Sequence, residues 1–303
     1  MLQGTTIEGT VVRVVDGDTV RVSSADLEDE ESLRILALDT EESNAGGSKP
    51  VTPFGHRAKE RAQEFFAPGD AVVLEFPGRE PVDVAIQRYR GNFGRLLVYL
   101  HKDGVDFQET MIREGFSPYF CKYGNAVFHH DAYRAAEREA QASRLGVWDQ
   151  IAVNGSEIRN YAALGTWWQL RARLIDDFRA LRPHEVDLLD SRLDFAEISR
   201  RAQTGDTVTV FTALERVRRI GQRHALVRIG SLQQPFALFI RDIEANPESQ
   251  RIVKLLETRY ISAGEDHPRR SYAYVRGALR LFNGTPEIEL TSIDQISDDF
   301  PGS

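Results

Sequence analysis

The strongest constraint on the fold is a set of acidic residues and arginines placed where predicted strands turn or end. Residues 14–20 contain the tight turn Asp16-Gly17-Asp18, and residues 33–42 run from an apolar strand into an acidic exit. A later strand begins at Arg95. Carboxylates can hold a hard cation, and arginines can grip a phosphate. A chain that folds these segments together is suited to cleaving phosphodiester bonds.

The apolar pattern of the first 150 residues predicts a small barrel with added helices. Five predicted strands with a helix after the third have the order of an OB-type Greek-key barrel. The predicted strands lie within residues 7–22 (a pair), 33–38, 71–76 and 95–100, and the predicted helices are 53–66, 107–114 and 126–144.

The second half repeats this order without repeating the sequence. Asn154-Gly155-Ser156 indicates a linker, and two predicted helices follow. Five strands with a helix between the third and fourth again indicate an OB-fold. We therefore predict an α+β protein, mainly β with helices, whose domains are 1–150 (catalytic barrel), 151–204 (helical connector) and 205–303 (second OB-fold barrel). The predicted elements are helices 158–181, 192–203 and 247–258, and strands 206–218, 225–230, 236–241, 272–281 and 287–290.

Bulk properties narrow the protein class. No apolar run is long enough to span a bilayer, and residues 1–6 have neither the basic nor the apolar region of a signal peptide. We therefore predict a cytoplasmic protein, with an exported protein that has lost its leader as the alternative. The single cysteine, Cys121, excludes an internal disulfide.

Charge is divided unevenly along the chain. Residues 1–150 hold 17 Lys+Arg and 25 Asp+Glu, which accounts for the whole net charge of −8, and residues 151–303 hold 21 of each. An acidic domain attracts a polyanion poorly, so affinity for nucleic acid is expected from the second half. There Tyr272 and Tyr274 share a strand face with Arg276, and Arg280 follows. Aromatic rings interleaved with arginines suit single-strand binding, with a protein-contact role as the alternative.

The acidic set Asp18, Asp39 and Glu42 offers only oxygen ligands. Such a set favours Ca²⁺ over zinc. Mn²⁺ or Mg²⁺ would then be weaker substitutes.

The order and spacing of these segments resemble the staphylococcal nuclease (thermonuclease) family over residues 7–150. The resemblance implies that Asp18 and Asp39 ligate the metal directly and that Thr40 offers its backbone carbonyl. It also implies that Glu42 contacts the metal mainly through water and positions or deprotonates the attacking water.

The same resemblance assigns the cationic and aromatic groups. Arg34 and Arg95 match the two catalytic arginines of the family, whose planar guanidinium groups neutralise charge that grows on the phosphate. Tyr123 matches a tyrosine that lines the nucleotide pocket.

Three positions depart from the family pattern. Glu41 stands where the family usually has proline, which adds a charge beside the site. Phe93 lacks the hydroxyl of a tyrosine that contacts a substrate phosphate in the family. Cys121 replaces a second tyrosine.

The predicted function is a metal-dependent nuclease of DNA or RNA that leaves 3′-phosphate ends, with single-stranded nucleic acid as the favoured partner. A nuclease specific for single-stranded repair or recombination intermediates is one alternative. A catalytically silent nucleic-acid-binding scaffold is the other, although such scaffolds typically lose the acids and arginines that this chain keeps.

Overall fold

The computed structural model describes residues 2–45, 51–91, 93–149, 151, 158–264 and 267–301. The chain divides into two compact units, Met1–Ala172 and Arg173–Ser303. The predicted linker at 154–156 lies outside the described residues. The predicted connector, 151–204, falls on both sides of the division, and the domain boundaries remain predictions from sequence. No helix in the described ranges combines the length and the apolar character needed to cross a membrane.

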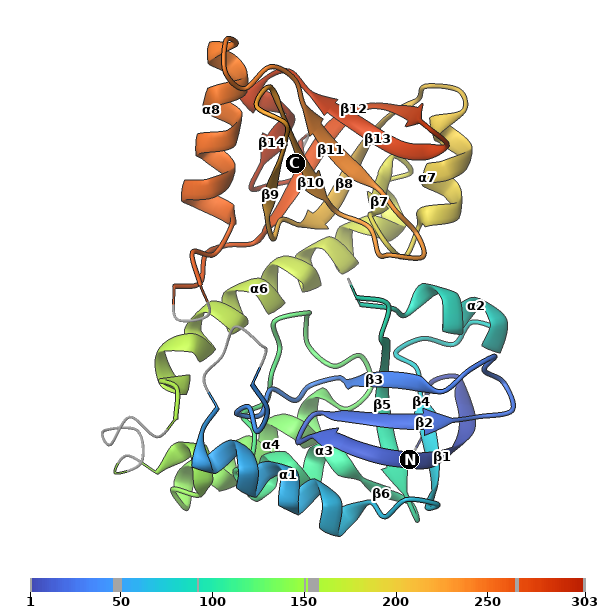
Figure 1. The fold of residues 1–303 in the computed structure, drawn as a ribbon, viewed down its shortest axis with the longest axis vertical. Helices are drawn as coiled ribbons and strands as arrows, with labels where there is room; N and C mark the ends of the chain where they lie inside the picture. The colour runs from blue at the N-terminus through green and yellow to red at the C-terminus, as the bar shows by residue number, and fades with distance from the viewer. Residues whose placement is uncertain are drawn as a thin grey trace. The chain divides into compact units, whose positions relative to one another are not determined.

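The first unit is built on a barrel of five strands, which confirms the predicted fold class (Figure 1). The strands follow the order β3-β2-β1-β4-β5, and β3 closes the barrel by pairing with β5 in parallel. Helix α1 connects β3 to β4, as an OB-type order requires. The elements are β1 (Thr6–Asp16), β2 (Thr19–Ser23), β3 (Glu31–Ile35), α1 (Pro53–Phe65), β4 (Ala71–Glu75), α2 (Val82–Arg88), β5 (Leu96–Lys102), β6 (Val105–Asp106), α3 (Phe107–Arg113), α4 (His130–Ala142) and the 3₁₀ turn η1 (Gly146–Trp148).

Strand β3 is shorter than the predicted strand 33–38. It ends at Ile35, and Ala37 has a φ of 63°, a left-handed conformation that a strand cannot contain. The chain therefore bends before Asp39 instead of continuing along the barrel. Leu33 of β3 pairs with Leu96, the first residue of β5. Arg34 follows Leu33 and Arg95 precedes Leu96, so the two arginines flank this pair.

Helix α1 packs directly on the acidic segment that follows β3. Thr52 caps the helix by accepting a hydrogen bond from the Gly55 backbone N–H at 3.0 Å. A Cβ atom on Gly55 would lie 2.0 Å from the backbone oxygen of Glu42. Only glycine permits this approach, so α1 fixes the backbone that carries Glu41 and Glu42.

The second unit contains one larger sheet with the order β7-β8-β12-β13-β11-β10-β9, and β14 pairs with β12. The antiparallel β8–β12 and parallel β11–β13 pairings are compatible with the predicted OB-type order. The predicted strand 206–218 is broken into β8 and β9. The elements are α6 (Tyr161–Leu181, whose first half belongs to the first unit), η2 (Arg182–His184), β7 (Leu188–Asp190), α7 (Phe195–Ala202), β8 (Thr207–Ala213), β9 (Val217–Ile220), β10 (His224–Arg228), β11 (Ala237–Ile240), α8 (Pro247–Leu255), the π turn η3 (Leu256–Tyr260), β12 (Tyr272–Phe282), β13 (Thr285–Leu290), η4 (Ile293–Gln295) and β14 (Ile296–Ser297).

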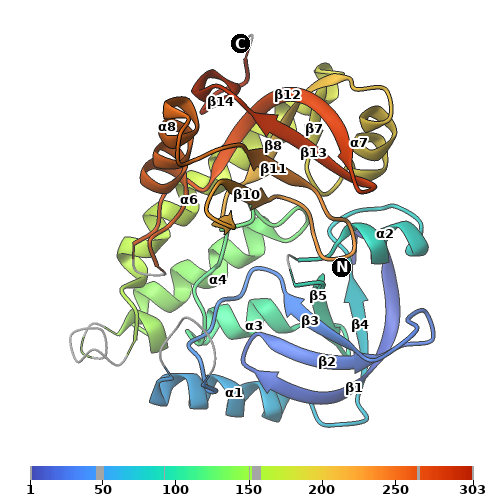
Figure 2. The same ribbon diagram turned by 45° about the horizontal axis from the view of Figure 1, so that its top comes forward.

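The second unit has its own apolar core. Helices α7 and α8 flank its sheet on different sides (Figure 2). Ile198 of α7 and Ile252 of α8 are fully buried in the same cluster as Val210, Val227 and Ile288 from the strands. Such burial supplies the driving force for this unit to fold around its sheet.

Candidate functional site

The turn between β1 and β2 brings the first predicted ligand into the interior. Asp18 is 6 % exposed, and its Oδ1 atom accepts a hydrogen bond from Thr19 at 2.9 Å. A Cβ atom on Gly17 would lie 2.8 Å from the Thr40 side chain, so glycine lets the turn approach the exit of β3. The Asp16 carboxylate accepts a hydrogen bond from the Ser43 backbone N–H at 3.2 Å, which ties the two segments together.

Arg34 joins the two predicted aspartate ligands. Its Nη1 atom donates to Asp18 Oδ2, and its Nη2 atom donates to Asp39 Oδ1 at 3.0 Å and to the Leu38 carbonyl at 3.2 Å. Burial alone would lower the pKa of Arg34, but the charges of Asp18 and Asp39 outweigh burial and raise it. Arg34 is therefore a fixed cation between two buried carboxylates.

Arg95 lies close enough to this group to share its electric field. Burial lowers the pKa of Arg95, and repulsion from Arg34 lowers it further. Asp18, Tyr123 and Glu42 act in the opposite direction on the same pKa. Arg34 lies on β3 and Arg95 directly precedes β5, which pairs with β3. Two guanidinium groups on paired strands can together bind an anion such as phosphate.

Thr40, Glu42 and Tyr123 occupy different positions around this group. Thr40 is 1 % exposed beside Gly17, and the Glu42 carbonyl accepts a hydrogen bond from Thr52 at 3.1 Å. Tyr123 is partly exposed, packs edge-on against Phe120, and influences the pKa of both Arg34 and Arg95. The structure thus brings the predicted acids, arginines and tyrosine into one neighbourhood.

Sequence reasoning missed two members of this neighbourhood. Arg159 donates from Nη2 to Asp39 Oδ2 at 2.9 Å and from Nε to Glu41 Oε1 at 3.1 Å. The Tyr161 hydroxyl donates to the same Glu41 oxygen at 2.5 Å. The extra charge of Glu41 was the signal that a counter-ion was needed, but nothing in the sequence identifies which cation supplies it.

The donor chemistry of this neighbourhood fits a hard cation. Asp18, Asp39 and Glu41 are buried carboxylates, and Glu41 Oε2 has no hydrogen-bond partner within the described part of the chain. An orphaned buried carboxylate oxygen is costly unless a cation or water satisfies it. Asp18 and Asp39 would hold the ion, with the Thr40 carbonyl as a further oxygen donor.

A second cluster of titratable side chains occurs on the barrel. His101 Nε2 and His129 Nε2 lie 2.9 Å and 2.7 Å from the same oxygen of Glu75, and the three ligand atoms form a candidate metal-ligand triad within 4.8 Å. Among the described residues this is the one such compact triad, and Asp18 and Asp39 pair with Arg34. The His129 side chain is directed inward and is only 10 % exposed.

Glu75 is satisfied from both sides. Its other oxygen accepts hydrogen bonds from the backbone N–H groups of Gln3 and Gly4 at 2.6 Å and 2.8 Å. Burial alone would raise the pKa of Glu75, but hydrogen bonds from His101, His129 and the two backbone groups lower it. The carboxylate therefore ties the start of the chain to β4 and β5.

Glu75→Gln should lower the free energy of unfolding by about 2 kcal/mol at pH 7, because a buried charged acceptor is lost. Because the pKa of Glu75 is lower in the folded protein than the ordinary value, the ionised carboxylate stabilises the fold at pH values above the ordinary pKa of glutamate. This contribution to the free energy of unfolding is lost progressively as the pH falls below that value. Denaturant unfolding from pH 7 to pH 3 should show the gap between wild type and variant narrowing. Glu60→Gln, at an exposed position, is the control and should unfold with the same free energy as the wild type. A Glu75→Gln destabilisation that is equal at pH 7 and at pH 3 would contradict this account.

The predicted nucleic-acid residues of the second unit are placed differently from the expectation. Tyr272 and Tyr274 are 9 % and 4 % exposed and pack on Phe211, which itself stacks on Phe178. Their burial argues against the expected stacking on bases. The alternating sequence pattern that places both tyrosines on one face of the strand is equally typical of a face that packs on the core.

The two predicted arginines of β12 also differ from each other. Arg276 is exposed, whereas Arg280 forms ion pairs with Glu287 and Glu289. Among the described residues, a further set of exposed arginines takes part in none of the ion pairs found. These are Arg216, Arg218, Arg219, Arg223 and Arg228, on and around the β9–β10 pair.

The sequence comparison identifies the first unit. Residues 32–150 match the family model described as staphylococcal nuclease homologue. These residues form a staphylococcal nuclease homologue domain. The chain is 32 % identical over 141 residues to endonuclease YncB of Bacillus subtilis, covering 46 % of this chain and 61 % of that protein. It is 31 % identical over 144 residues to the SPbeta prophage-derived endonuclease YokF of the same organism, covering 48 % and 45 %. The chain thus spans less than two thirds of the length of either relative.

Proposed function

We propose that this chain is a divalent-metal-dependent nuclease whose reaction centre lies in the first unit, which contains the staphylococcal nuclease homologue domain. The single observation that carries the proposal is the bridge from Arg34 to both Asp18 and Asp39, with Arg95 held nearby. The domain match and the two relatives named endonucleases support a nuclease hydrolase. The retained acids and arginines disfavour a silent scaffold.

Each side chain has a separate task in the proposed reaction. Arg34 and Arg95 bind the non-bridging oxygens of the scissile phosphate and neutralise charge in the transition state. Glu42 orients the attacking water or takes its proton. Asp18, Asp39 and the Thr40 carbonyl would hold a divalent cation, which we propose to be Ca²⁺, and that ion would supply further neutralisation of the phosphate. Tyr123 lines the nucleotide side of the site. In-line attack with departure of the 5′ oxygen would leave 3′-phosphate ends.

The test is cleavage of labelled single- and double-stranded DNA and RNA with Ca²⁺, Mg²⁺, Mn²⁺ or chelator. Product ends are read by their sensitivity to a 3′-phosphatase. Glu42→Gln is the matched control, because it preserves size while removing the carboxylate charge. If Glu42→Gln cleaves at the wild-type rate, a contaminating nuclease is responsible for the cleavage. That result would overturn the assignment of the reaction centre to these residues.

We further propose that the second unit binds single-stranded nucleic acid. The support is the charge distribution: residues 151–303, which include this unit, are neutral while residues 1–150 carry −8, and exposed arginines gather at the β9–β10 pair. Arg218 lies opposite Leu226, so it shares a face with Arg228 two residues further along β10. Phosphate contacts from this face would offset the repulsion of the acidic domain.

Arg218→Gln with Arg228→Gln should weaken binding of a labelled oligonucleotide and flatten its salt dependence. Each lost phosphate contact should lower the slope of log K against log salt by about 0.7 for a single strand. Fluorescence anisotropy of the full chain across a salt series measures this slope. Arg200→Gln, an exposed arginine paired with Glu197 on α7, is the control and should leave the slope unchanged. An unchanged slope in the double variant would leave this barrel as a protein-contact module.

A further inference from the structure

The segment just beyond the family-matched residues enters the proposed metal site. Arg159 is 7 % exposed and follows residue 150, where the family match ends. Its backbone N–H, its Nε and its Nη2 atoms all bind the acidic exit of β3, two of them on Glu41 and one on Asp39. The contact therefore involves a buried, multiply bonded arginine and not a passing surface ion pair.

Arg159 and Arg34 bind different oxygens of the Asp39 carboxylate. Arg34 binds Asp39 Oδ1 at 3.0 Å, and Arg159 binds Asp39 Oδ2 at 2.9 Å. Two cations on opposite oxygens fix the rotation of the carboxylate about its side-chain bond. Asp39 is consequently held in one orientation before any substrate or ion arrives.

Arg159 also balances the residue that departs from the family pattern. Glu41 is fully buried, and its Oε1 atom accepts hydrogen bonds from Arg159 and from Tyr161. A buried carboxylate without a counter-charge is strongly unfavourable, so Glu41 and Arg159 are chemically dependent on each other.

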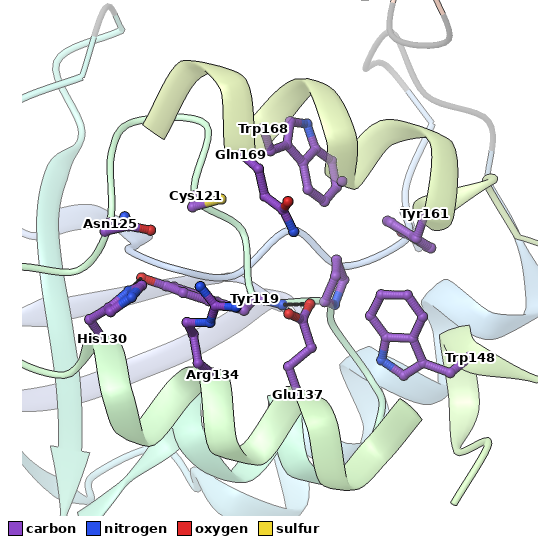
Figure 3. A pocket seen from close by; sticks show the side chains of 12 residues that line it. Tyr119, Cys121, Asn125, His130, Arg134, Glu137, Trp148, Tyr161, Trp168 and Gln169 are labelled. Atoms are coloured by element: carbon purple, nitrogen blue, oxygen red, sulfur yellow. Dashed lines mark hydrogen bonds between the residues drawn. The ribbon is translucent and has the colours of Figure 1, made fainter. Parts of the chain in front are cut away.

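The rest of the segment anchors Arg159 in place. Tyr161 and Trp168 of α6 point toward the side chains of α4 and its preceding loop, as does Gln169 (Figure 3). The Trp168 ring packs edge-on against Phe120 with centroids 4.8 Å apart, and Phe120 lies under the Arg34 guanidinium at 5.7 Å. A continuous set of contacts therefore connects α6 with Arg34 and with Arg159.

We propose that Arg159 is a positioning residue of the metal site, which orients Asp39 and cancels the charge that Glu41 adds. This inference rests on the proposed nuclease function. With Arg159 present, Glu41 contributes no net charge to cation binding, and Asp39 presents its oxygens in a fixed direction. The family domain alone, residues 32–150, lacks this part of its own site.

The test combines calcium titration calorimetry with steady-state cleavage for four variants. Arg159→Met should bind Ca²⁺ about tenfold more tightly, because a cation beside a metal ligand is removed, and Glu41→Gln should bind it about tenfold more weakly. The double variant Glu41→Gln/Arg159→Met should return to near the wild-type affinity. Its turnover should still fall by roughly tenfold, because Asp39 is no longer oriented. Arg159→Lys keeps the charge and should retain wild-type affinity with an intermediate turnover.

Arg61→Met is the matched control, because Arg61 makes a two-point ion pair with Glu114 in the same unit. It should lower the melting temperature without changing calcium affinity. If Arg159→Met behaves like Arg61→Met, Arg159 is only a structural contact and the inference is overturned. Wild-type affinity and turnover in Arg159→Met would overturn it equally. A wild-type protein that neither binds Ca²⁺ nor cleaves would instead overturn the proposed function, so the two failures are distinct.

Discussion

Arg95→Lys should lower the turnover of nucleic-acid cleavage by about 10²-fold or more, nearly as much as Arg95→Ala. A lysine retains the charge but cannot donate two parallel hydrogen bonds to a phosphate. The structure adds a second reason, because the pairing of β3 with β5 places Arg95 near the strand that carries Arg34. Two forked cations on paired strands can bind one phosphate from two sides. Arg34→Lys and Glu42→Gln should act on the same step with losses of similar order.

Single-turnover cleavage at saturating substrate measures this effect without product release. Circular dichroism and thermal melting confirm that each variant is folded. Arg113→Lys is a suitable control, because Arg113 of α3 pairs with Glu109 and Glu139 rather than with the predicted acids. A folded Arg95→Lys protein that turns over at the wild-type rate would remove Arg95 from the transition state.

Chelation should abolish cleavage, and Asp39→Ala should reduce it below detection at the calcium concentration that saturates the wild type. Asp39 is 3 % exposed and carries hydrogen bonds from two arginines, so its loss removes a ligand and leaves both cations unbalanced. Asp18→Ala should weaken metal binding through the loss of the other carboxylate on Arg34.

Calcium titration followed by calorimetry separates metal loss from misfolding. Asp39→Asn keeps the shape of the side chain and distinguishes charge from packing. Asp70→Asn, which removes an ion-pair partner of Lys102 away from the predicted ligand set, should retain normal metal affinity. Full activity in excess chelator would refute the metal requirement.

The barrel of the first unit was predictable because its signals are local. Strands with alternating or continuous burial, the turn at Gly17 and the helix beginning at Pro53 all appear in the structure. The bend at Ala37 was missed, because alanine gives no sign of a left-handed conformation. Helix α4 begins at His130 and not at residue 126, and His129, the residue before it, contacts Glu75.

The site was predictable in part for the same reason. Asp18, Asp39, Arg34 and Arg95 lie in short segments with recognisable spacing. Arg159 could not be found, because 118 residues separate it from Glu41 and its role depends only on tertiary contact. Tyr272 and Tyr274 were misjudged because an aromatic face of a strand looks the same in sequence whether it meets a base or Phe211.

The contacts made by residues 158–172 have a consequence for how such a protein can be divided or recombined. A fragment that stops at residue 150 would remove the counter-charge of a buried carboxylate and uncover the Phe120 ring at the same time. A gene fusion joined at that point would inherit both defects, whatever domain followed. A breakpoint that keeps these contacts intact must lie beyond Trp168, well past residue 150, where the recognisable family sequence ends.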